Sequence, residues 1–254
     1  MGFLHHVLSH PLTRGFSVDD PLTTSLRREI IEDKAFLRAL YSEWYQKIVS
    51  ALPVKTDILE LGSGAGFFEK LLPNVITSEI FETPGVKLVA DACDLPFLDG
   101  SLNAIVMTDV FHHIPNVRQF LLEATRCVKP GGKIVMIEPW RTRWSEWVYT
   151  HLHPEPFSIE SGWEIPNDGP LSGANGALPW IVFERDRKTF ESDFPQWRIN
   201  VIELMMPSVY LLSGGVSMRS FLPAWIYRPL RTLERYFGET RYAMFAFIEL
   251  ERIS

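Results

Sequence analysis

The stretch Ile58-Leu-Glu-Leu-Gly-Ser-Gly-Ala-Gly66 decides the fold of this chain. Residues 56–61 are a short, largely apolar strand candidate, and three glycines follow at once. A glycine-rich turn between a strand and a helix lets the backbone approach a ligand closely and directs free N–H groups at it. The stretch therefore predicts a ligand-binding turn at the end of a buried strand.

The spacing of the glycines separates two classes of cofactor that use such a turn. The dinucleotide fingerprint is G-x-G-x-x-G, but here the glycines stand at 62, 64 and 66, and Phe67 takes the last position of that fingerprint. A bulky side chain where the helix must close on the strand argues against a nicotinamide cofactor. Glu60 argues the same way, because its carboxylate would repel a pyrophosphate but would suit an ammonium group.

Short strands and helices alternate around this turn, from residue 56 to residue 138. Further strands are expected over 75–79, 87–90, 102–107 and 133–137. A short helix is expected over 67–72, and apolar residues at helical spacing predict an amphipathic helix over 117–128. Short apolar strands between helices indicate a parallel sheet that is covered on both faces.

The flanking regions have a different character. From Leu22 to Leu52 apolar residues recur at helical spacing, which predicts one amphipathic helix ended by Pro53. Residues 140–180 are rich in Pro, Gly and Trp and are interpreted as an inserted substrate or cover segment. Beyond them we expect a helical stretch over 178–194, strands over 197–205 and 242–250, and a basic, aromatic amphipathic segment over 220–237.

Composition limits the class of protein. Of 254 residues, 46% are hydrophobic and 22% are charged, which is ordinary globular usage and excludes disorder for most of the chain. The net charge of −6 argues against a nucleic-acid partner. Two cysteines, Cys93 and Cys127, exclude a disulfide framework and favour a reducing, cytoplasmic compartment. The N-terminus does not have the pattern of a signal peptide, and no apolar run approaches the ~20 residues of a spanning helix.

Four motifs together carry a family resemblance. The segment Glu60–Gly66 resembles the first motif of the class I S-adenosylmethionine-dependent methyltransferases, specifically the type 11 kind. Leu95-Pro-Phe97, Phe111-His-His113 and Val128-Lys-Pro-Gly-Gly132 fall in the order and spacing of the family's later motifs. The resemblance covers roughly residues 55–140. It implies a doubly wound α/β fold with a mostly parallel, seven-stranded, Rossmann-like sheet.

The same resemblance suggests a division of the chain. Residues 1–54 would form an N-terminal helical cover, 55–140 the cofactor-binding core, and 141–254 an acceptor-side insertion with the last two strands of the same domain. One departure from the family stands out. Only residues 80–85 separate the second and third strands, which is too short for the usual helical crossover. We therefore expect that helix to be shortened or absent and the third strand to be rudimentary, with this sheet edge covered by the N-terminal helix or a partner chain.

The resemblance implies a site for S-adenosylmethionine, and for its product S-adenosylhomocysteine, along the C-terminal edge of the sheet. The motifs place its cofactor-binding residues at Glu60, Gly62, Ser63, Gly64, Gly66, Glu79, Asp91, Ala92, Thr108 and Asp109. Glu60 and the glycine turn would hold the methionine end, and Glu79 would accept hydrogen bonds from both ribose hydroxyls. Asp91 and Ala92 would lie at the adenine, and Thr108 and Asp109 near the sulfonium. The alternatives are a solvated strand-end charge for Glu79 and a turn cap for Asp91.

Histidines are the candidate catalytic residues. His112 and His113 suit a general base, because histidine titrates near neutrality; the alternative is a packing or capping role. His151, His153 and the nearby Glu155 would allow a metal site, but one H-x-H in a Pro-rich loop is weak evidence. The sequence therefore predicts no metal.

The acceptor pocket is expected from residues 140–240. An apolar or sugar-stacking surface is indicated by Trp140, Trp144, Trp147, Trp163 and Trp180. In the segment 220–237, Arg228, Arg231 and Arg235 fall on one helical face. Three interpretations stay open: a packed helix with a solvated arginine face, a lid or homodimer contact, or a helix lying in a membrane interface.

The sequence thus predicts an enzyme that moves a methyl group to a small-molecule, sugar or lipid-linked acceptor, in the cytoplasm or peripherally on a membrane. Such a reaction depends mainly on orientation and desolvation, and needs a base only when the acceptor is a poor nucleophile. The alternatives are a non-catalytic cofactor-binding or regulatory protein of the same fold, and transfer of an aminopropyl group from a decarboxylated cofactor.

Overall fold

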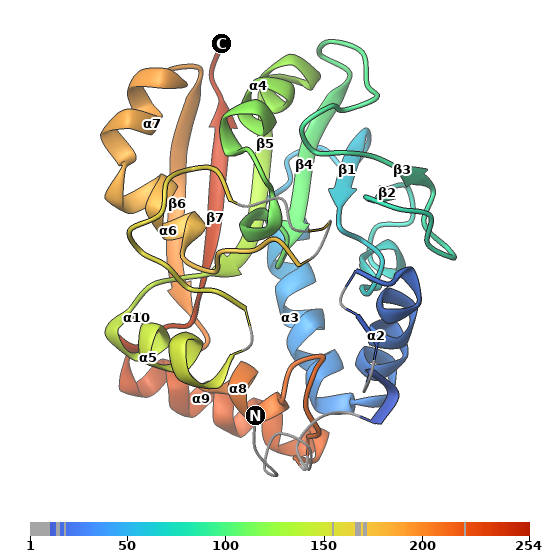
Figure 1. The fold of residues 1–254 in the computed structure, drawn as a ribbon, viewed down its shortest axis with the longest axis vertical. Helices are drawn as coiled ribbons and strands as arrows, with labels where there is room; N and C mark the ends of the chain where they lie inside the picture. Colours follow the sequence, from blue (N-terminus) through green and yellow to red (C-terminus); the bar gives the residue numbers. More distant parts are fainter. Residues whose placement is uncertain are drawn as a thin grey trace.

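A computed structural model describes residues 11–13, 16–17, 19–153, 155–165, 169, 172–220 and 222–254. Its strands form one sheet in the order β3-β2-β1-β4-β5-β7-β6 (Figure 1). They are β1 (Ile58–Leu61), β2 (Ile76–Glu79), β3 (Leu88–Val89), β4 (Leu102–Thr108), β5 (Val128–Pro139), β6 (Trp197–Met205) and β7 (Phe245–Arg252). Strands β1 to β5 pair in parallel, and β7 is antiparallel to β5 and β6. The predicted mostly parallel, seven-stranded sheet is confirmed.

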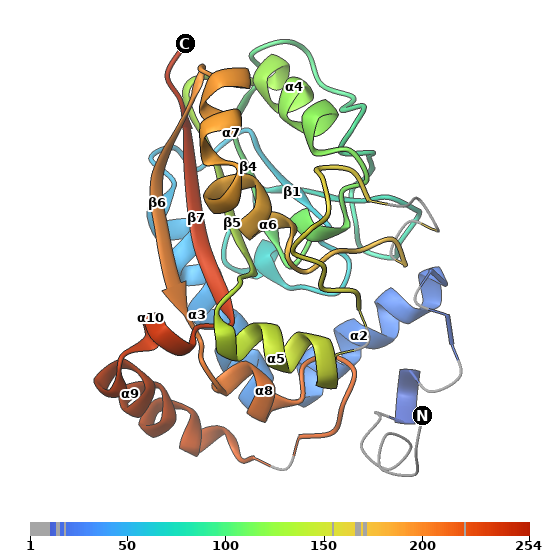
Figure 2. The ribbon, with the colours of Figure 1, turned by 60° about the vertical axis from the view of Figure 1, so that its left-hand side comes forward.

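Helices cover both faces of the sheet (Figure 2). On one face α4 (Val117–Cys127), α6 (Leu178–Trp180) and α7 (Arg187–Asp193) pack on residues such as Ile105 and Met107. On the other face α3 (Ala35–Ala51) packs on Ala104 and Val106. Alternate residues of β4 therefore enter opposite cores, as expected of a strand buried on both faces.

The predicted helix over 22–52 is two helices, α2 (Pro21–Asp33) and α3, so the single-helix prediction was wrong. The break is at Lys34, which has φ −82° and ψ 87°. Its ammonium group donates to the carbonyls of Gly215 at 2.5 Å and Met218 at 2.8 Å. Burial lowers the pKa of Lys34 to about 8. These long-range bonds hold Lys34 in a conformation that a continuous helix would not allow.

The connections near the glycine turn are short. No helix lies between β2 and β3, whose intervening residues are all described, and β3 has two residues, as predicted. The helix expected over 67–72 is reduced to one 3₁₀ turn, η2 (Phe68–Lys70). The rings of Phe67 and Phe68 instead pack edge-on against Tyr45 of α3, with centroids 5.0 and 5.2 Å away.

The C-terminal half adds α6 and α7 on a face of the sheet, and further helices near the carboxyl ends of the parallel strands (Figure 1). Helix α5 (Arg143–Leu152) follows β5 and begins with a capping box between Thr142 and Ser145. The stretch predicted helical over 178–194 comprises α6, a π-helical turn η4 (Ile181–Arg185) and α7. Between β6 and β7 lie α8 (Val209–Ser213), η5 (Ala224–Ile226), α9 (Tyr227–Phe237) and α10 (Glu239–Tyr242). Among the described helices, none has the length and apolar character needed to cross a bilayer.

Candidate functional site

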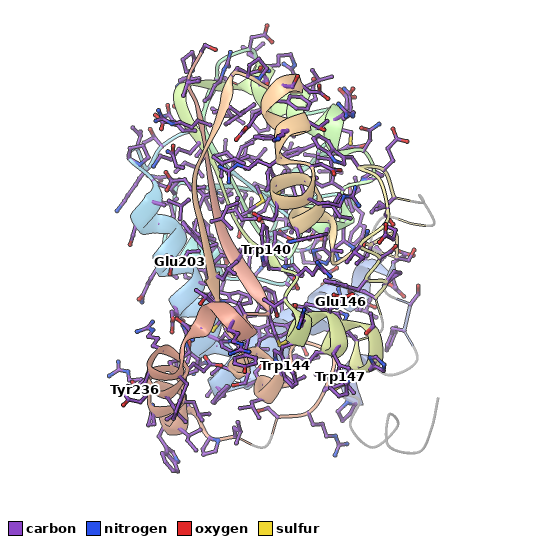
Figure 3. The ribbon with its side chains drawn as sticks, turned by 90° about the vertical axis from the view of Figure 1, so that its left-hand side faces the viewer. Trp140, Trp144, Glu146, Trp147, Glu203 and Tyr236 are labelled. Atoms are coloured by element: carbon purple, nitrogen blue, oxygen red, sulfur yellow. The ribbon has the colours of Figure 1, made fainter. Side chains whose placement is uncertain are left out.

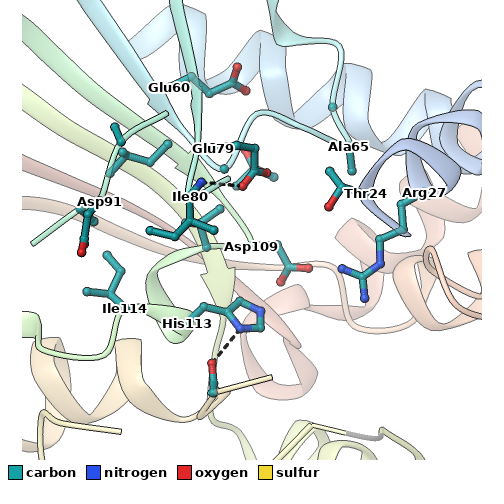
Figure 4. A pocket seen from close by; sticks show the side chains of 18 of the residues that line it. Thr24, Arg27, Glu60, Ala65, Glu79, Ile80, Asp91, Asp109, His113 and Ile114 are labelled. Carbon is teal, nitrogen blue, oxygen red and sulfur yellow. Dashed lines mark hydrogen bonds between the residues drawn. The ribbon is translucent and has the colours of Figure 1, made fainter. Parts of the chain in front are cut away.

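A cavity of about 330 Å³ lies at the carboxyl ends of β1, β2 and β4, and α2 and α3 close it from the opposite side (Figure 4). Most of the predicted cofactor residues line it, namely Glu60, Gly62, Gly66, Glu79, Asp91, Ala92, Thr108 and Asp109. The sequence motifs are therefore brought together around one space, although they are spread over 50 residues of chain.

Ser63 and Gly64 act from within the turn instead of lining the cavity. The buried Ser63 hydroxyl donates to the Glu60 carbonyl at 3.1 Å and accepts from the Ser78 amide at 3.1 Å. The Ser63 amide also donates to the Ser78 carbonyl at 2.9 Å. Ser63 thus ties the turn after β1 to the neighbouring strand β2.

The three glycines are required by close approach of other elements. A Cβ at Gly62, where φ is +67°, would lie 2.4 Å from Val110 Cγ2. A Cβ at Gly64 would lie 2.4 Å from Thr24 Cγ2, and one at Gly66 would lie 2.3 Å from the Tyr45 hydroxyl. The turn is therefore enclosed by α2, by α3 and by the connection after β4, and only glycine fits without displacing them.

Glu60 supplies a buried carboxylate to the cavity wall. Its side chain is 4% exposed, and its Oε2 accepts no hydrogen bond from any described residue. Burial raises the pKa of Glu60 to about 8, and the nearby Glu69 and Glu79 add to this. Buried polar atoms are almost always partnered. An orphaned carboxylate oxygen beside a cavity therefore fits a ligand that brings a cationic N–H donor.

Glu79 is buried at the end of β2, so the alternative of a solvated charge is wrong. Its Oε1 accepts from the Gly64 amide and its Oε2 from the Ile80 amide, each at 3.1 Å (Figure 4). Burial raises the pKa of Glu79, while these two amides oppose the rise. Asp91 is exposed, and its Oδ1 accepts from the Cys93 amide at 2.8 Å, so it caps a turn as well as lining the cavity.

Asp109 follows β4 in the left-handed backbone region, with φ +62°. Such a conformation is uncommon for a residue other than glycine and is often found at functional sites. Asp109 lines the main cavity and also a smaller hollow bordered by Tyr149, Glu155 and Tyr210. Burial raises the pKa of Asp109 to about 7, although His112 acts in the opposite direction.

The two predicted catalytic histidines have different surroundings. His112 is 1% exposed and is not among the cavity-lining residues. Its Nδ1 lies 2.8 Å from Glu138 Oε2, and its Nε2 lies 3.4 Å from Glu155 Oε2. Burial disfavours the charged ring, but the two glutamates outweigh it and raise the pKa of His112 well above its usual range.

His113 lines the cavity, and its Nδ1 lies 3.1 Å from the Gly173 carbonyl (Figure 4). Burial, followed by the neighbouring charge of His112, lowers the pKa of His113 to about 4. His113 is therefore neutral at physiological pH, whereas His112 is cationic.

The sequence did not identify the lining residues that α2 and α3 contribute, which are Thr24, Arg27, Tyr41 and Tyr45. The Arg27 guanidinium points into the cavity (Figure 4) and forms no ion pair with any described residue. The helical periodicity of residues 22–52 indicated an amphipathic cover. The periodicity did not indicate which side chains of these two helices point into the cavity.

The tryptophans predicted to form the acceptor surface do not line the cavity. Trp140 and Trp163 belong to the core, and the Trp163 indole donates to Asp186 at 2.9 Å. Trp144 donates to the Pro207 carbonyl, and Trp147 is half-exposed on α5 (Figure 3). Their role in the described structure is mainly packing.

The three arginines expected on one face of 220–237 have different surroundings. Arg231 is 5% exposed and pairs with Glu43 at 2.8 Å, with Glu234 at 2.5 Å and with Glu239. Arg228 and Arg235 are exposed, although Arg235 also pairs with Glu43, at 2.9 Å. Arg231 thus anchors α9 to α3 through this charge network.

Large apolar side chains occupy the opposite, solvent-facing side of the segment. They form what we call the aromatic stripe, namely Trp225, Leu233, Tyr236 and Phe237. Trp225, Tyr236 and Phe237 are more than 70% exposed, and Figure 3 shows Tyr236 at the outer edge of the molecule. The segment therefore exposes these apolar side chains together with Arg228 and Arg235.

Comparison with known proteins agrees with this geometry. A family model described as a methyltransferase domain matches residues 59–136. The chain contains a class I S-adenosylmethionine-dependent methyltransferase domain. The matched residues of this methyltransferase domain run from β1 into β5 and include the glycine turn, Glu79 and Asp109.

Two curated methyltransferases align with parts of the chain. Demethylmenaquinone methyltransferase of Tropheryma whipplei (strain Twist) is 44% identical over 45 residues, which is 18% of this chain and 19% of that protein. The 2-methyl-6-phytyl-1,4-hydroquinone methyltransferase of Synechocystis sp. is 25% identical over 214 residues, covering 71% of this chain and 65% of that protein. The chain therefore covers less than two thirds of the length of either relative.

A solved structure extends the likeness in fold beyond the matched domain. Geranyl diphosphate C-methyltransferase from Streptomyces coelicolor A3(2), in complex with Mg²⁺, geranyl diphosphate and S-adenosyl-L-homocysteine, superposes with a TM-score of 0.53. It is 13% identical and covers 96% of this chain and 91% of that one. At this identity the comparison establishes the fold, which is that of class I methyltransferases.

Proposed function

We propose that this chain is an S-adenosylmethionine-dependent methyltransferase that acts on a small-molecule acceptor with an apolar tail. The orphaned Glu60 oxygen, buried at the cavity beside the glycine turn, is the observation that carries this proposal. It fits the ammonium group of a methionine moiety. When bound, S-adenosylmethionine supplies an electrophilic methyl group on a sulfonium.

Each part of the cofactor has a matching group in the cavity wall. Glu60 would accept from the ammonium group, and the unpaired Arg27 guanidinium would hold the carboxylate. Glu79 would accept from the two ribose hydroxyls. Ile80 and Ile114, which lie on the Asp91 side of the cavity in Figure 4, would supply apolar contacts to the adenine.

An unpaired arginine that lines the same cavity as Glu60 favours an intact amino-acid end over a decarboxylated one. Calorimetry with S-adenosylmethionine and its decarboxylated form tests this. We expect the intact form to bind more tightly, and Arg27→Ala to remove most of the difference. Arg38→Ala, which removes an exposed arginine of α3, is the matched control. Tighter binding of the decarboxylated form would support aminopropyl transfer instead.

Asp109 is the group best placed to act on the acceptor. Its carboxyl lies where the main cavity meets the smaller hollow, and its pKa of about 7 suits a group that takes a proton near neutrality. We propose that Asp109 accepts this proton when the acceptor is a hydroxyl or an activated ring carbon. His112, tied to Glu138 and Glu155, would act as a positioning residue.

The acceptor class is inferred from the relatives and from α9. The two curated relatives are named for demethylmenaquinone and for a phytyl-substituted hydroquinone. The aromatic stripe, flanked by the exposed Arg228, has the composition of helices that lie in a membrane interface. We therefore propose that the protein takes its acceptor at a membrane surface, with this stripe in contact with lipid.

The reaction is tested by incubating the protein with S-adenosylmethionine labelled in the methyl group and a cell extract separated into lipid and aqueous phases. We expect label in the lipid phase and its loss with Glu60→Ala. Tight binding of S-adenosylhomocysteine without label in either phase would indicate a non-catalytic binding protein.

The membrane contact is tested by co-sedimentation with vesicles of phosphatidylcholine and phosphatidylglycerol. Replacing Leu233, Tyr236 and Phe237 together by Ser should reduce binding, whereas Trp147→Ser on α5 should not. Equal binding of the parent and the triple variant would exclude the stripe as a lipid contact. If sedimentation velocity gives a lower molar mass for the triple variant than for the parent, the aromatic stripe is a homodimer interface.

A further inference from the structure

His112, His113 and Glu155 converge at one wall of the cavity. One ligand atom from each lies within 4.8 Å of the other two. The distance from His112 Nε2 to Glu155 Oε2 is 3.4 Å. In a tetrahedral site with bonds of about 2.1 Å, neighbouring ligand atoms are about 3.4 Å apart. This pair therefore already has the separation of two ligands on one metal ion.

The other ring nitrogens of both histidines are engaged by acceptors. Glu138 Oε2 lies 2.8 Å from His112 Nδ1, while Glu138 Oε1 accepts from two backbone amides. The Gly173 carbonyl lies 3.1 Å from His113 Nδ1. A carbonyl can only accept, and Glu138 already accepts two other hydrogen bonds, from these backbone amides, so we infer that both rings carry a proton at Nδ1. The neutral His113 then presents a lone pair at Nε2, and on the cationic His112 a metal ion would take the place of the Nε2 proton.

Hydrogen bonds of this kind, from the second ring nitrogen to an acceptor, are typical of metal-binding histidines. Metal-binding histidines almost always donate their second N–H to a carboxylate or a backbone carbonyl, which fixes the ring. Here His112 has the carboxylate and His113 has the carbonyl. The two rings also lie close together, with centroids 4.2 Å apart and planes at 41°. A ring nitrogen of each histidine therefore lies close to the Glu155 carboxylate.

The cluster is accessible to a substrate. His113 lines the main cavity, Glu155 lines the smaller hollow, and Asp109 lines both. An ion held here would lie between these spaces, next to the carboxyl proposed to act on the acceptor. His151, considered with His153 from the sequence, is exposed, and its Nδ1 lies 2.8 Å from the Trp147 carbonyl. It does not belong to the cluster.

We propose that His112 Nε2, His113 Nε2 and the Glu155 carboxylate bind one divalent transition-metal ion. Two imidazoles and one carboxylate favour ions such as Zn²⁺, Fe²⁺ or Mn²⁺ over Mg²⁺ or Ca²⁺ and leave positions open. The open positions would take an oxygen of the acceptor, a hydroxyl or a diphosphate, and a bound hydroxyl would ionise more easily. This role rests on the proposed methyl transfer, whereas the ion site itself does not.

Metal binding is tested on tag-free, chelator-treated protein. Titration with Zn²⁺, Mn²⁺ and, without oxygen, Fe²⁺ should reveal one tight site per chain for at least one of them. Loading with Co²⁺ should give visible absorption bands of a histidine-liganded ion. His113→Ala and Glu155→Gln should each weaken binding by at least about 100-fold, and the removal of an outer partner in Glu138→Gln by about 10- to 100-fold. His151→Ala is the matched control and should bind as the parent does.

Binding of S-adenosylhomocysteine, measured on the same samples, verifies that Glu155→Gln and Glu138→Gln are folded, because neither residue lines the cavity. His113 does line it, so circular dichroism and thermal unfolding verify the fold of His113→Ala. Should Glu155→Gln fail to fold, His113→Gln takes its place. Parent protein that binds no ion, or variants that bind it unchanged, would overturn the site and leave a protonated His112 bridging the two glutamates. Removal of the ion without a change in KM for the acceptor would overturn its assigned role but not the methyl transfer.

Discussion

The Gly64 amide donates a 3.1 Å hydrogen bond to Glu79 Oε1, which joins the glycine turn after β1 to the carboxylate at the end of β2. A second amide, that of Ile80, donates to Glu79 Oε2 at the same distance. The carboxylate is therefore oriented by the backbone before a ligand arrives. Two positions that look independent in the sequence act as one unit, and a change at either should affect ligand binding.

Glu79→Ala removes the proposed acceptor of two ribose hydroxyls together with the partner of the Gly64 amide. Binding of S-adenosylhomocysteine should weaken by roughly 2–3 kcal/mol, the scale of hydrogen bonds to a charged group. Isothermal calorimetry checks this, with Glu82→Ala in the exposed loop after β2 as the control. An unchanged dissociation constant in folded Glu79→Ala would mean that the ribose is held by other residues.

Gly64→Ala introduces a Cβ 2.4 Å from Thr24 Cγ2 and 2.8 Å from Glu79 Oε1. Because α2 and the carboxylate must both move, the free energy of unfolding should fall by about 1–3 kcal/mol. Affinity for S-adenosylhomocysteine should fall as well. Chemical denaturation measures the first effect, and Gly162→Ala, where a Cβ meets open space, is the control. Equal stability of the two variants would contradict the close approach of α2.

Glu60 should make stability and binding depend on pH. Its pKa is about 8 in the folded chain against an ordinary value of 4.5, so the folded state keeps a proton that the unfolded state has lost. The free energy of unfolding should therefore decrease as pH rises from about 4.5 to 8, by more in the parent than in Glu60→Gln. Denaturation curves across this range measure the difference, and identical pH slopes would show that Glu60 is not protonated.

The same group should release a proton on binding. An ammonium group beside Glu60 favours its ionised form, so roughly 0.9 proton should leave Glu60 at pH 7. Calorimetry in buffers of different ionisation enthalpy counts the protons. The release should be smaller by that amount in Glu60→Gln, and an equal count in both proteins would place the ammonium elsewhere.

Arg231→Ala should be strongly destabilising. Arg231 lies among Glu43, Glu234 and Glu239, and its removal leaves the largely buried Glu234 without its cation. Breaking such a network costs about 3 kcal/mol, whereas loss of the exposed Arg228 should change stability by less than about 0.5 kcal/mol. Thermal unfolding of the two variants compares them directly. Similar melting temperatures would mean that Arg231 is solvated in solution.

Local sequence patterns were sufficient to predict the part of the site that lies nearest the sheet. The strand, the glycine turn and Glu79 lie within 22 residues, and parallel pairing alone brings the strand ends to one edge. The missing helix between β2 and β3 was predicted in the same way, because six residues cannot form a helical crossover. Each of these inferences depends on contacts that the sequence spacing already limits.

The remaining features depend on contacts between distant segments. Lys34 breaks the N-terminal helix through carbonyls about 180 residues later. The partner of His112, Glu155, lies in a segment without a helical or strand pattern of its own. The placement of α9 stayed open in the sequence because periodicity identifies two faces but not which one is buried. Glutamates from α3 and from the segment itself hold Arg231 in a buried position.

The unpaired carboxyl group of Glu60 should also affect how fast the protein is degraded in a cell. A ligand that binds the folded chain alone adds about 2.7 kcal/mol of stability at 100 times its dissociation constant. Proteases degrade the unfolded fraction, so we expect the abundance of this protein to follow the supply of S-adenosylmethionine. A pulse-chase experiment in methionine-starved cells should reveal a shorter half-life for the parent. Glu60→Gln, which should bind the ammonium group more weakly, should lose less of its half-life.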